Sequence, residues 1–446
     1  MSKTFRPYQP DQMLLLPVAL QEWLPEDHLA YFISDVVDHL DLGPIMSRYE
    51  VEPRGYPPYH PRMMVKVLVY AYCIGVPSSR KIEKHLHQDI AFRVLAANNT
   101  PDFRTISDFR KDHLEALGDL FLQVLQLCQQ AGLVKLGHVS LDGTKVRANA
   151  SKHKAMSYGR MKEQEARLEA EVEQLLKEAQ EVDEGEDRLY GKERRGDELP
   201  QELSFRASRL KKIREAKAAL EEEAREQAQK ARDQGKNHSR VPEEKAQRNF
   251  TDPDSRIMPA PGGKEFLQAY NCQAAVDRAH QVIVAAQVTN RPSDKAQALP
   301  LIRDIETNTG ALPREASADA GYYSAEVVGE LYDLGVDPFI PPDKTRHGVV
   351  LPLAPRGRIP SQLSPADRMR RKLRTQKGRK RYALRMGTVE PVFGQIKQGR
   401  GFRQFLLRGQ EKVEQEWRLI CAGHNLLKLF TWVGKISQLR GVPAAA

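Results

Sequence analysis

One acidic residue, Glu390, lies within a strongly basic stretch of the sequence. Lysines and arginines flank it on both sides, at Arg381, Arg385, Lys397, Arg400 and Arg403. A carboxylate among cations suits a group that binds a metal ion while its neighbours bind phosphates. Taken by itself, the stretch is more simply explained as an amphipathic helix whose charges are solvated.

Apolar residues around Glu390 predict that helix. Val389, Val392, Phe393 and Ile396 recur at the i, i+3, i+4 and i+7 spacing of one helix face. Glu390 and Lys397 are two turns apart on the other face, so their side chains point the same way.

Two aspartates lie where strands are predicted to end. Residues 139–146 alternate between apolar and polar, which predicts a strand with Asp142 directly before Gly143. Residues 315–321 predict a short strand that ends in Asp319, again close to a glycine. Most aspartates at strand ends only form turns, so neither residue alone indicates a site.

The elements around these strands follow an α/β order. A hairpin at 266–276 and 281–288 is followed by a helix at 294–307, the strand at 315–321, a helix at 324–334 and a strand from 337. Three antiparallel strands and a fourth parallel to the first place Asp142 beside Asp319, and a helix across that edge brings Glu390 to both. We therefore expect a ribonuclease H-like fold, an α/β fold with a mixed five-stranded sheet flanked by helices.

Three converging carboxylates are the hard oxygen ligands that two Mg²⁺ ions require. Two such ions about 4 Å apart can activate an attacking oxygen and stabilise a leaving oxygen in an in-line displacement. The sequence thus predicts a metal site at Asp142, Asp319 and Glu390, with Mg²⁺ as the metal and Mn²⁺ as an alternative.

The remaining segments suggest further domains. Residues 1–135 are predicted to be entirely helical, and their short helices fit either a helix-turn-helix DNA-binding module or a bundle for dimerisation. Residues 155–249 are rich in charge and predict an inserted helical hairpin arm with a break at 183–200. The catalytic domain would comprise 136–154 plus 250–435, and 436–446 would be a C-terminal tail.

The overall charge favours a polyanionic partner. The chain has 69 basic and 59 acidic residues, a formal net charge of +10. Residues 368–381 hold nine of the cations and no acid; because this run leads to Glu390, we interpret it as part of a phosphate-binding groove. Four widely spaced cysteines indicate buried thiols in a cytoplasmic protein, and no apolar run predicts a membrane span or an export signal.

Four strings resemble DDE transposases of bacterial insertion sequences, with the insertion-sequence 1182 family as the nearest group. They are Ser-Leu-Asp142-Gly-Thr, Ala-Asp319-Ala-Gly-Tyr-Tyr, Thr-Val-Glu390-Pro-Val-Phe-Gly-Gln-Ile-Lys, and Pro-Asp-Phe-Arg-Thr-Ile-Ser-Asp-Phe-Arg at 101–110. The resemblance covers nearly the whole chain. It implies that Asp142, Asp319 and Glu390 are catalytic metal ligands of a ribonuclease H-like domain.

A family signature of the form Tyr-x2-Arg-x3-Glu-x6-Lys is only partly kept. Tyr382, Arg385, Glu390 and Lys397 are present, but four residues instead of three separate Arg385 from Glu390. On a continuous helix this places Arg385 about 100° from the family's arginine, and Pro391 either begins or kinks the helix. The expected DNA-phosphate contacts are Lys397, Arg400, Arg403, Arg385, Tyr382, Lys372 and Lys377.

The expected function is that of a transposase which cuts double-stranded DNA at the terminal inverted repeats of its element and joins the 3′ ends to target DNA. Cutting two ends together implies a homodimer or a higher assembly on DNA. The place of action would be the cytoplasm of a bacterium, at the nucleoid. Two alternatives are a metal-dependent nuclease without strand transfer, and a catalytically silent DNA-binding relic or regulator.

Overall fold

The computed structural model describes residues 20–50, 57–190, 201–233, 235, 237–260, 265–344, 352–354, 357–358, 360 and 362–440. Contacts group the chain into two units, one of residues 1–134 with 418–446 and one of residues 135–417. The predicted catalytic segment extended to 435, whereas residues from Arg418 onward group with the N-terminal helices. The predicted helix near 13–20 lies almost entirely outside the described residues.

The described residues of the first unit form helices joined by short turns. Its elements are a 3₁₀ turn at Leu20–Trp23, α1 (Leu29–His39), α2 (Gly43–Glu50), α3 (Pro61–Ile74), α4 (Ser79–Gln88), α5 (Ile90–Leu95), α6 (Phe103–Asp112), α7 (Leu114–Gln130) and the part of α15 (Gln410–Arg440) beyond Trp417. Helix α3 begins with Pro61 and ends at Gly75, whose φ of 80° suits a glycine.

One boundary in this unit differs from the prediction. A single helix over 105–130 was expected, but α6 and α7 are separate and meet at His113. Asp102 caps α6, its carboxylate accepting a hydrogen bond from the Thr105 N–H (2.7 Å). The helix therefore begins earlier than the apolar pattern alone indicated.

The second unit contains a mixed six-stranded sheet in the order β4-β5-β1-β7-β8, with β6 also paired to β5. The strands are β1 (Val139–Arg147), β4 (Arg256–Pro259), β5 (Phe266–Asp277), β6 (Ile283–Thr289), β7 (Glu315–Ser317) and β8 (Asp337–Phe339). Strands β4 and β6 pair with successive parts of β5, and β7 runs parallel to both β1 and β8.

This confirms an α/β fold with a mixed sheet, and the layout is compatible with a ribonuclease H-like arrangement. The predicted number of five strands is wrong, because β4 adds a sixth. Residues 256–259 return from the inserted arm and pair with the first residues of β5, which the pattern along the sequence did not show.

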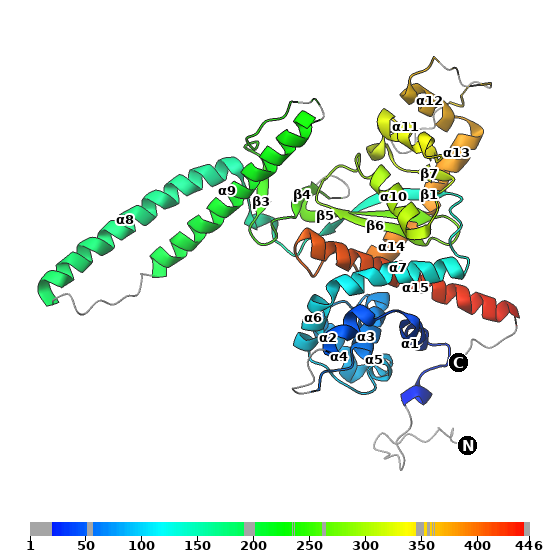
Figure 1. Ribbon diagram of the computed structural model, residues 1–446, viewed down its shortest axis with the longest axis horizontal. Helices are drawn as coiled ribbons and strands as arrows, with labels where there is room; N and C mark the ends of the chain where they lie inside the picture. The colour runs from blue at the N-terminus through cyan, green and yellow to red at the C-terminus, as the bar shows by residue number, and fades with distance from the viewer. Residues whose placement is uncertain are drawn as a thin grey trace, which may run out of the picture. The chain divides into compact units, whose positions relative to one another are not determined.

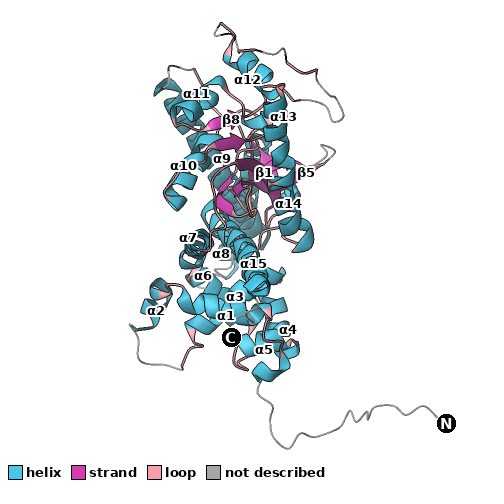
Figure 2. Cartoon of the chain, turned by 90° about the vertical axis from the view of Figure 1, so that its right-hand side faces the viewer, coloured by secondary structure: helices cyan, strands magenta, loops and turns pink. Residues whose placement is uncertain are grey.

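Helices cover both faces of this sheet (Figure 2). Helices α10 (Ala298–Thr309) and α11 (Ala325–Asp333) lie on one side, and α13 (Gln376–Ala383) and α14 (Val389–Gly394) lie on the other. Helix α12 (Pro365–Leu373) precedes α13. Helix α10 was expected from Asp294 but begins at Ala298, since the side chain of Asp294 binds strand β5 instead of capping the helix.

The inserted segment is a pair of long helices, α8 (Tyr158–Tyr190) and α9 (Gln201–Asp233), side by side in Figure 1. Ion pairs between Arg214 and Glu165 (3.0 Å) and between Arg206 and Glu171 (3.5 Å) show that the helices are antiparallel. In this hairpin α8 continues through Tyr190, past the break expected from 183. Short strands β2 (Ala155–Ser157) and β3 (Gln247–Asn249) pair at its base.

Two further expectations concern the described residues as a whole. All four cysteines are buried free thiols, as predicted. Within the described ranges, no helix combines the length and the apolar character that crossing a membrane requires.

The apolar seam of the arm can be tested at Ile213, which is only 1% exposed. We expect Ile213→Ala to destabilise the arm by about 2–5 kcal/mol, because it leaves a cavity between α8 and α9. Circular dichroism of the full chain should show helix melting at a lower temperature. Lys212→Ala is the matched control, since Lys212 is exposed. Equal melting of the two variants would contradict a packed seam.

Candidate active site

The register of two parallel strands places the two aspartates together. Ser140 of β1 pairs with Ser317 of β7. Asp142 lies two residues beyond Ser140 and on the same face of β1, and Asp319 lies two residues beyond Ser317, in the extended backbone that follows β7. The predicted juxtaposition of Asp142 and Asp319 follows from this register, and the Asp319 carboxylate is close enough to raise the pKa of Asp142.

Backbone N–H groups orient both carboxylates. Asp142 accepts a hydrogen bond from the Gly143 N–H (2.9 Å). The prediction that each aspartate ends a strand is wrong, because Asp142 is the fourth residue of β1 and Asp319 lies beyond the end of β7. Asp319 caps a 3₁₀ turn at Ala320–Tyr322 and accepts a hydrogen bond from the Gly321 N–H (2.8 Å). The two motifs therefore hold their aspartates in defined positions by local contacts.

A buried polar cluster connects the paired strands β1 and β7. The two ring nitrogens of His138 lie 3.0 Å from Glu315 Oε2 and 3.0 Å from Ser317 Oγ, and Ser317 is 3.0 Å from the hydroxyl of Ser140. Arg381 of α13 pairs with the other oxygen of Glu315 (3.2 Å). This chain of contacts connects β1 and β7 to the helix that precedes Arg385.

Glu390 is carried by a short helix packed on the sheet. The four apolar residues predicted for its inner face are all buried, at Val389, Val392, Phe393 and Ile396. Pro391 is the third residue of α14, where the missing N–H costs no helical hydrogen bond. The proline therefore belongs to the beginning of the helix, and the Glu390 side chain stays half exposed.

Arg385 joins the first strand to this helix. Its guanidinium lies 2.8 Å from Asp142 Oδ2 and 3.6 Å from Glu390 Oε1. A 3₁₀ segment, Leu384–Gly387, separates α13 from α14, so the extra residue before Glu390 does not rotate Arg385 away. The helix is interrupted, so the continuous helix on which the 100° displacement was predicted is not present.

Burial and neighbouring charges act on Asp142 in opposite directions. Burial raises the pKa of Asp142 to about 6, the Arg385 guanidinium lowers it and the Asp319 carboxylate raises it. Arg385 is thus the cation that compensates for a buried carboxylate.

The donor chemistry suits a divalent metal ion, but the three carboxylates are not gathered around one point. Nowhere among the described residues do three His, Cys, Asp or Glu side chains come close enough to hold one ion. Asp142 and Glu390 nevertheless face the same guanidinium, which stands in for a cation between them. Carboxylate oxygens are the ligands that Mg²⁺ and Mn²⁺ prefer.

The expected phosphate-binding residues next to Glu390 lie close to the site. Lys397 donates to Thr144 Oγ1 (3.0 Å) and to the carbonyl oxygen of Lys145 (3.1 Å), both on the strand of Asp142. Burial lowers the pKa of Lys397. Arg403 donates to the Lys397 carbonyl (3.2 Å), and the Arg400 guanidinium lies over the Phe402 ring.

The other three candidates have different surroundings. Burial raises the pKa of Tyr382, and the Arg385 guanidinium lowers it, which places the phenol beside Arg385. Lys377 is exposed on α13. Lys372 donates to Asp337 and to the Pro338 carbonyl (2.7 Å), so its ammonium anchors α12 to β8.

Two segments of the chain match known protein families. Residues 18–112 match a family described as a transposase domain (DUF772), and residues 357–430 match one described as a transposase DDE domain. Both matches support a DDE transposase of an insertion element. The resemblance to the insertion-sequence 1182 family is consistent with both matches. Comparisons with curated proteins and with solved structures found no match.

Some of the candidate site residues lie inside a matched segment and others lie outside. Glu390 and the seven candidate phosphate contacts lie within 357–430, whereas Asp142 and Asp319 lie outside both matches. DDE transposases act on DNA and generally use divalent metal ions.

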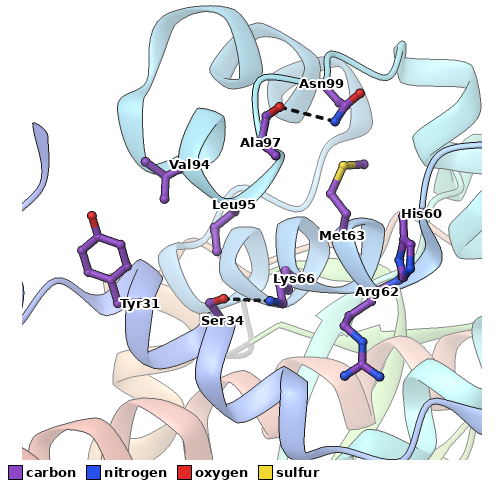
Figure 3. Close-up of a pocket in the computed structure, with 10 residues that line it drawn as sticks. All are labelled: Tyr31, Ser34, His60, Arg62, Met63, Lys66, Val94, Leu95, Ala97 and Asn99. Atoms are coloured by element: carbon purple, nitrogen blue, oxygen red, sulfur yellow. Dashed lines mark hydrogen bonds between the residues drawn. The ribbon is translucent and has the colours of Figure 1, made fainter. Parts of the chain in front are cut away.

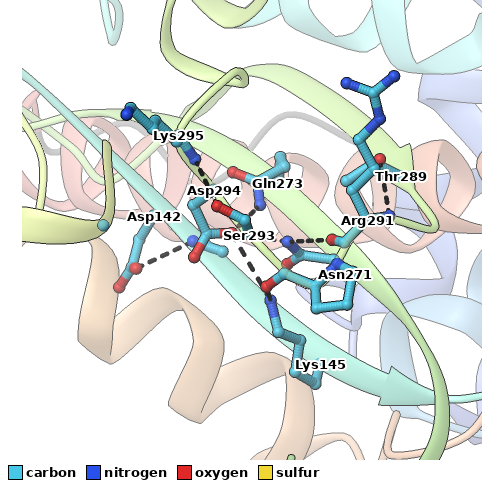
Figure 4. A network of polar contacts seen from close by, with 12 residues as sticks. Asp142, Lys145, Asn271, Gln273, Thr289, Arg291, Ser293, Asp294 and Lys295 are labelled. Carbon is cyan, nitrogen blue, oxygen red and sulfur yellow. Dashed lines mark hydrogen bonds and ion pairs between the residues drawn. The ribbon is translucent and has the colours of Figure 1, made fainter. Parts of the chain in front are cut away.

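A polar network that the sequence did not bring out lies on the other face of β1 (Figure 4). Asp294 Oδ1 accepts hydrogen bonds from Asn271 (2.6 Å) and Gln273 (2.7 Å), and Lys145 lies 3.6 Å away. A signal was present, because Asn271 and Gln273 are polar residues at alternate positions of a buried strand. Nothing local in the sequence indicated that Asp294 would be their partner.

A pocket of about 410 Å³ lies in the helical unit (Figure 3). None of its lining residues was predicted to belong to a site. Its lining includes two cationic side chains, Lys66 and Arg62. Lys66 contacts Ser34 (2.8 Å) and Asp38 (2.7 Å), and Arg62 pairs with the same Asp38 (3.4 Å), so both cations already have partners within the protein.

Removing Arg385 should change metal binding. We expect Arg385→Gln to bind Mn²⁺ about tenfold more tightly, or about 1.4 kcal/mol, because the variant lacks the cation that competes for Asp142 and Glu390. Electron paramagnetic resonance of Mn²⁺, with the chain free of DNA, measures this affinity.

Arg381→Gln is the matched control for this measurement, since Arg381 pairs with Glu315 and not with the two site carboxylates. The same Mn²⁺ affinity for both variants and the wild type would show that Arg385 does not compete with the metal.

Proposed function

We propose that this transposase cleaves DNA at the ends of its insertion element and joins those ends to target DNA, with Asp142, Asp319 and Glu390 as its catalytic carboxylates. The register of β1 and β7 supports this most directly, because each aspartate follows one of the paired residues Ser140 and Ser317 by two positions. Arg385 contacts Asp142 and Glu390 together, which supports the third member.

We further propose that the catalytic unit is ribonuclease H-like and binds two divalent ions, Mg²⁺ or Mn²⁺. The strand order and the helices on both faces support the fold. When bound, such ions activate the attacking oxygen and stabilise the leaving oxygen. Asp142 and Glu390 would hold them where Arg385 now lies, together with Asp319.

The cations around Glu390 would hold the DNA backbone. Lys397 lies against the strand of Asp142, two residues beyond that aspartate. Its ammonium, with the guanidinium groups of Arg400 and Arg403, would offer charge-assisted hydrogen bonds to the phosphates on either side of the cut. Arg385 and Tyr382 would join them once the metal ions neutralise Asp142 and Glu390.

Two ends of one element must be cut and joined together, so the working form would contain at least two copies of the chain on double-stranded DNA. The terminal inverted repeats and the target are the expected partners. The helical unit, with its match to a transposase domain, is our candidate for recognising the repeats or for dimerisation. The enzyme would work in the bacterial cytoplasm, at the nucleoid.

The carboxylates can be tested by single substitutions. We expect Asp142→Asn, Asp319→Asn and Glu390→Gln each to abolish Mg²⁺-dependent cleavage of element-end DNA, because each removes a charged oxygen ligand. Binding to the same DNA should be retained. Gel assays of nicked and joined products measure both activities.

Asp333→Asn controls for a carboxylate lost from the surface of α11, where Asp333 is exposed. Normal cleavage by any one of the three variants would remove that residue from the proposed set. Cleavage by the wild type without joined products would instead identify a nuclease.

The basic helices can be tested by salt dependence. We expect Lys377→Ala to weaken DNA binding and to reduce the slope of log K against log salt by about one unit, because one phosphate contact is lost. Lys372→Ala should lower the melting temperature and change the slope less, since Lys372 binds Asp337 within the protein. An unchanged slope for Lys377→Ala would show that this residue does not contact DNA.

A further inference from the structure

The side chains of Asp294, Gln273 and Tyr322 form one chain of hydrogen bonds near the two aspartates. Gln273 of β5 is fully buried, and its Nε2 donates to Asp294 Oδ1 (2.7 Å). Its Oε1 accepts a hydrogen bond from the hydroxyl of Tyr322, which is also fully buried. The amide of Gln273 is thereby held in one orientation, with its donor toward Asp294 and its acceptor toward Tyr322.

Tyr322 belongs to the turn that Asp319 begins. The turn spans Ala320–Tyr322, and the Tyr322 N–H donates to the carbonyl oxygen of Asp319 (3.2 Å). Burial raises the pKa of Tyr322 well above its usual value, and the carboxylates of Asp294, Asp142 and Asp319 raise it further. The phenol therefore lies near all three carboxylates.

The same chain reaches the strand of Asp142 at its other end. Lys145 of β1 lies 3.6 Å from Asp294 Oδ1 and donates to the Pro292 carbonyl (3.1 Å). Gly143, directly after Asp142, faces Gln273 across the strands. A Cβ at Gly143 would lie 2.4 Å from Gln273 Nε2 and 2.7 Å from Asp294 Oδ1, so only glycine leaves room for Asp294.

We propose that Asp294 is a positioning residue, which through Gln273 and Tyr322 holds the turn of Asp319 at a fixed distance from Asp142. Lys145 and Asn271 hold the Asp294 carboxylate, Asp294 orients the amide of Gln273, and that amide holds Tyr322. Asp294 itself need not touch DNA or metal. The inference rests on the proposed function, since it gives the Asp142–Asp319 spacing a catalytic purpose.

The test reverses the polarity of one hydrogen bond. In Asp294→Asn the new amide cannot accept from both Asn271 and Gln273 with the strength of a carboxylate. In Gln273→Glu two carboxylates face each other. The double variant, Asp294→Asn with Gln273→Glu, restores a bond of opposite direction, keeps an acceptor for Tyr322 and conserves the net charge.

We expect each single variant to lower kcat for cleavage of element-end DNA by about 10- to 100-fold, with DNA affinity unchanged. The double variant should recover most of this loss. Hydrogen exchange of the peptide covering 318–323 should be faster in the single variants and return toward the wild type in the double variant. Asp304→Asn is the matched control, because Gln287 donates to Asp304 (2.7 Å) in a similar Gln–Asp bond between β6 and α10.

The outcomes separate the two proposals. If the wild type cleaves DNA but Asp294→Asn keeps its kcat and its exchange rates, the positioning role is refuted. It is also refuted if the double variant is as slow as the single variants, or if Asp304→Asn loses as much activity. If the wild type cleaves no DNA, the proposed function fails, while faster exchange at 318–323 only in the single variants would still support the contact chain.

Discussion

The parallel pairing of β1 with β7 is the constraint on which the candidate site depends. It covers only two residue pairs, Val139 with Ala316 and Ser140 with Ser317. A shift of one residue would turn either aspartate to the opposite face of the sheet. Buried hydroxyls of Ser140 and Ser317, together with His138, connect the strands at this point, so the register is set by polar contacts as well as by backbone hydrogen bonds.

The face of β1 that carries Asp142 is held together by ion pairs. The Asp142 side chain is only 16% exposed, and its negative charge is compensated by Arg385, which also reaches Glu390. The opposite face of β1 carries a second charged group, Asp294, held by Lys145 and by two buried amides. Asp142 and Asp294 thus lie on opposite faces of β1. Arg385 pairs with Asp142, and Lys145 pairs with Asp294.

Local patterns were enough to predict much of this. Alternation predicted β1, although the expected strand end at Asp142 was wrong, and the i, i+3, i+4, i+7 spacing indicated the buried face of α14 and of the helical segment that follows it. The direction of Arg385 was not predictable, because it depends on the 3₁₀ segment Leu384–Gly387, which no periodicity in the sequence indicates. Asp294 was missed because its partners are more than twenty residues away and the contact depends on tertiary packing.

The central claim is that Asp142, Asp319 and Glu390 bind the same divalent ions. Cleavage of the polypeptide by Fe²⁺ and ascorbate tests it directly, because radicals formed at a bound Fe²⁺ cut the backbone nearby. The account predicts cuts close to 142, 319 and 390 that excess Mg²⁺ suppresses together. Cuts at only one of these places, or cuts that Mg²⁺ leaves unchanged, would contradict a shared metal site.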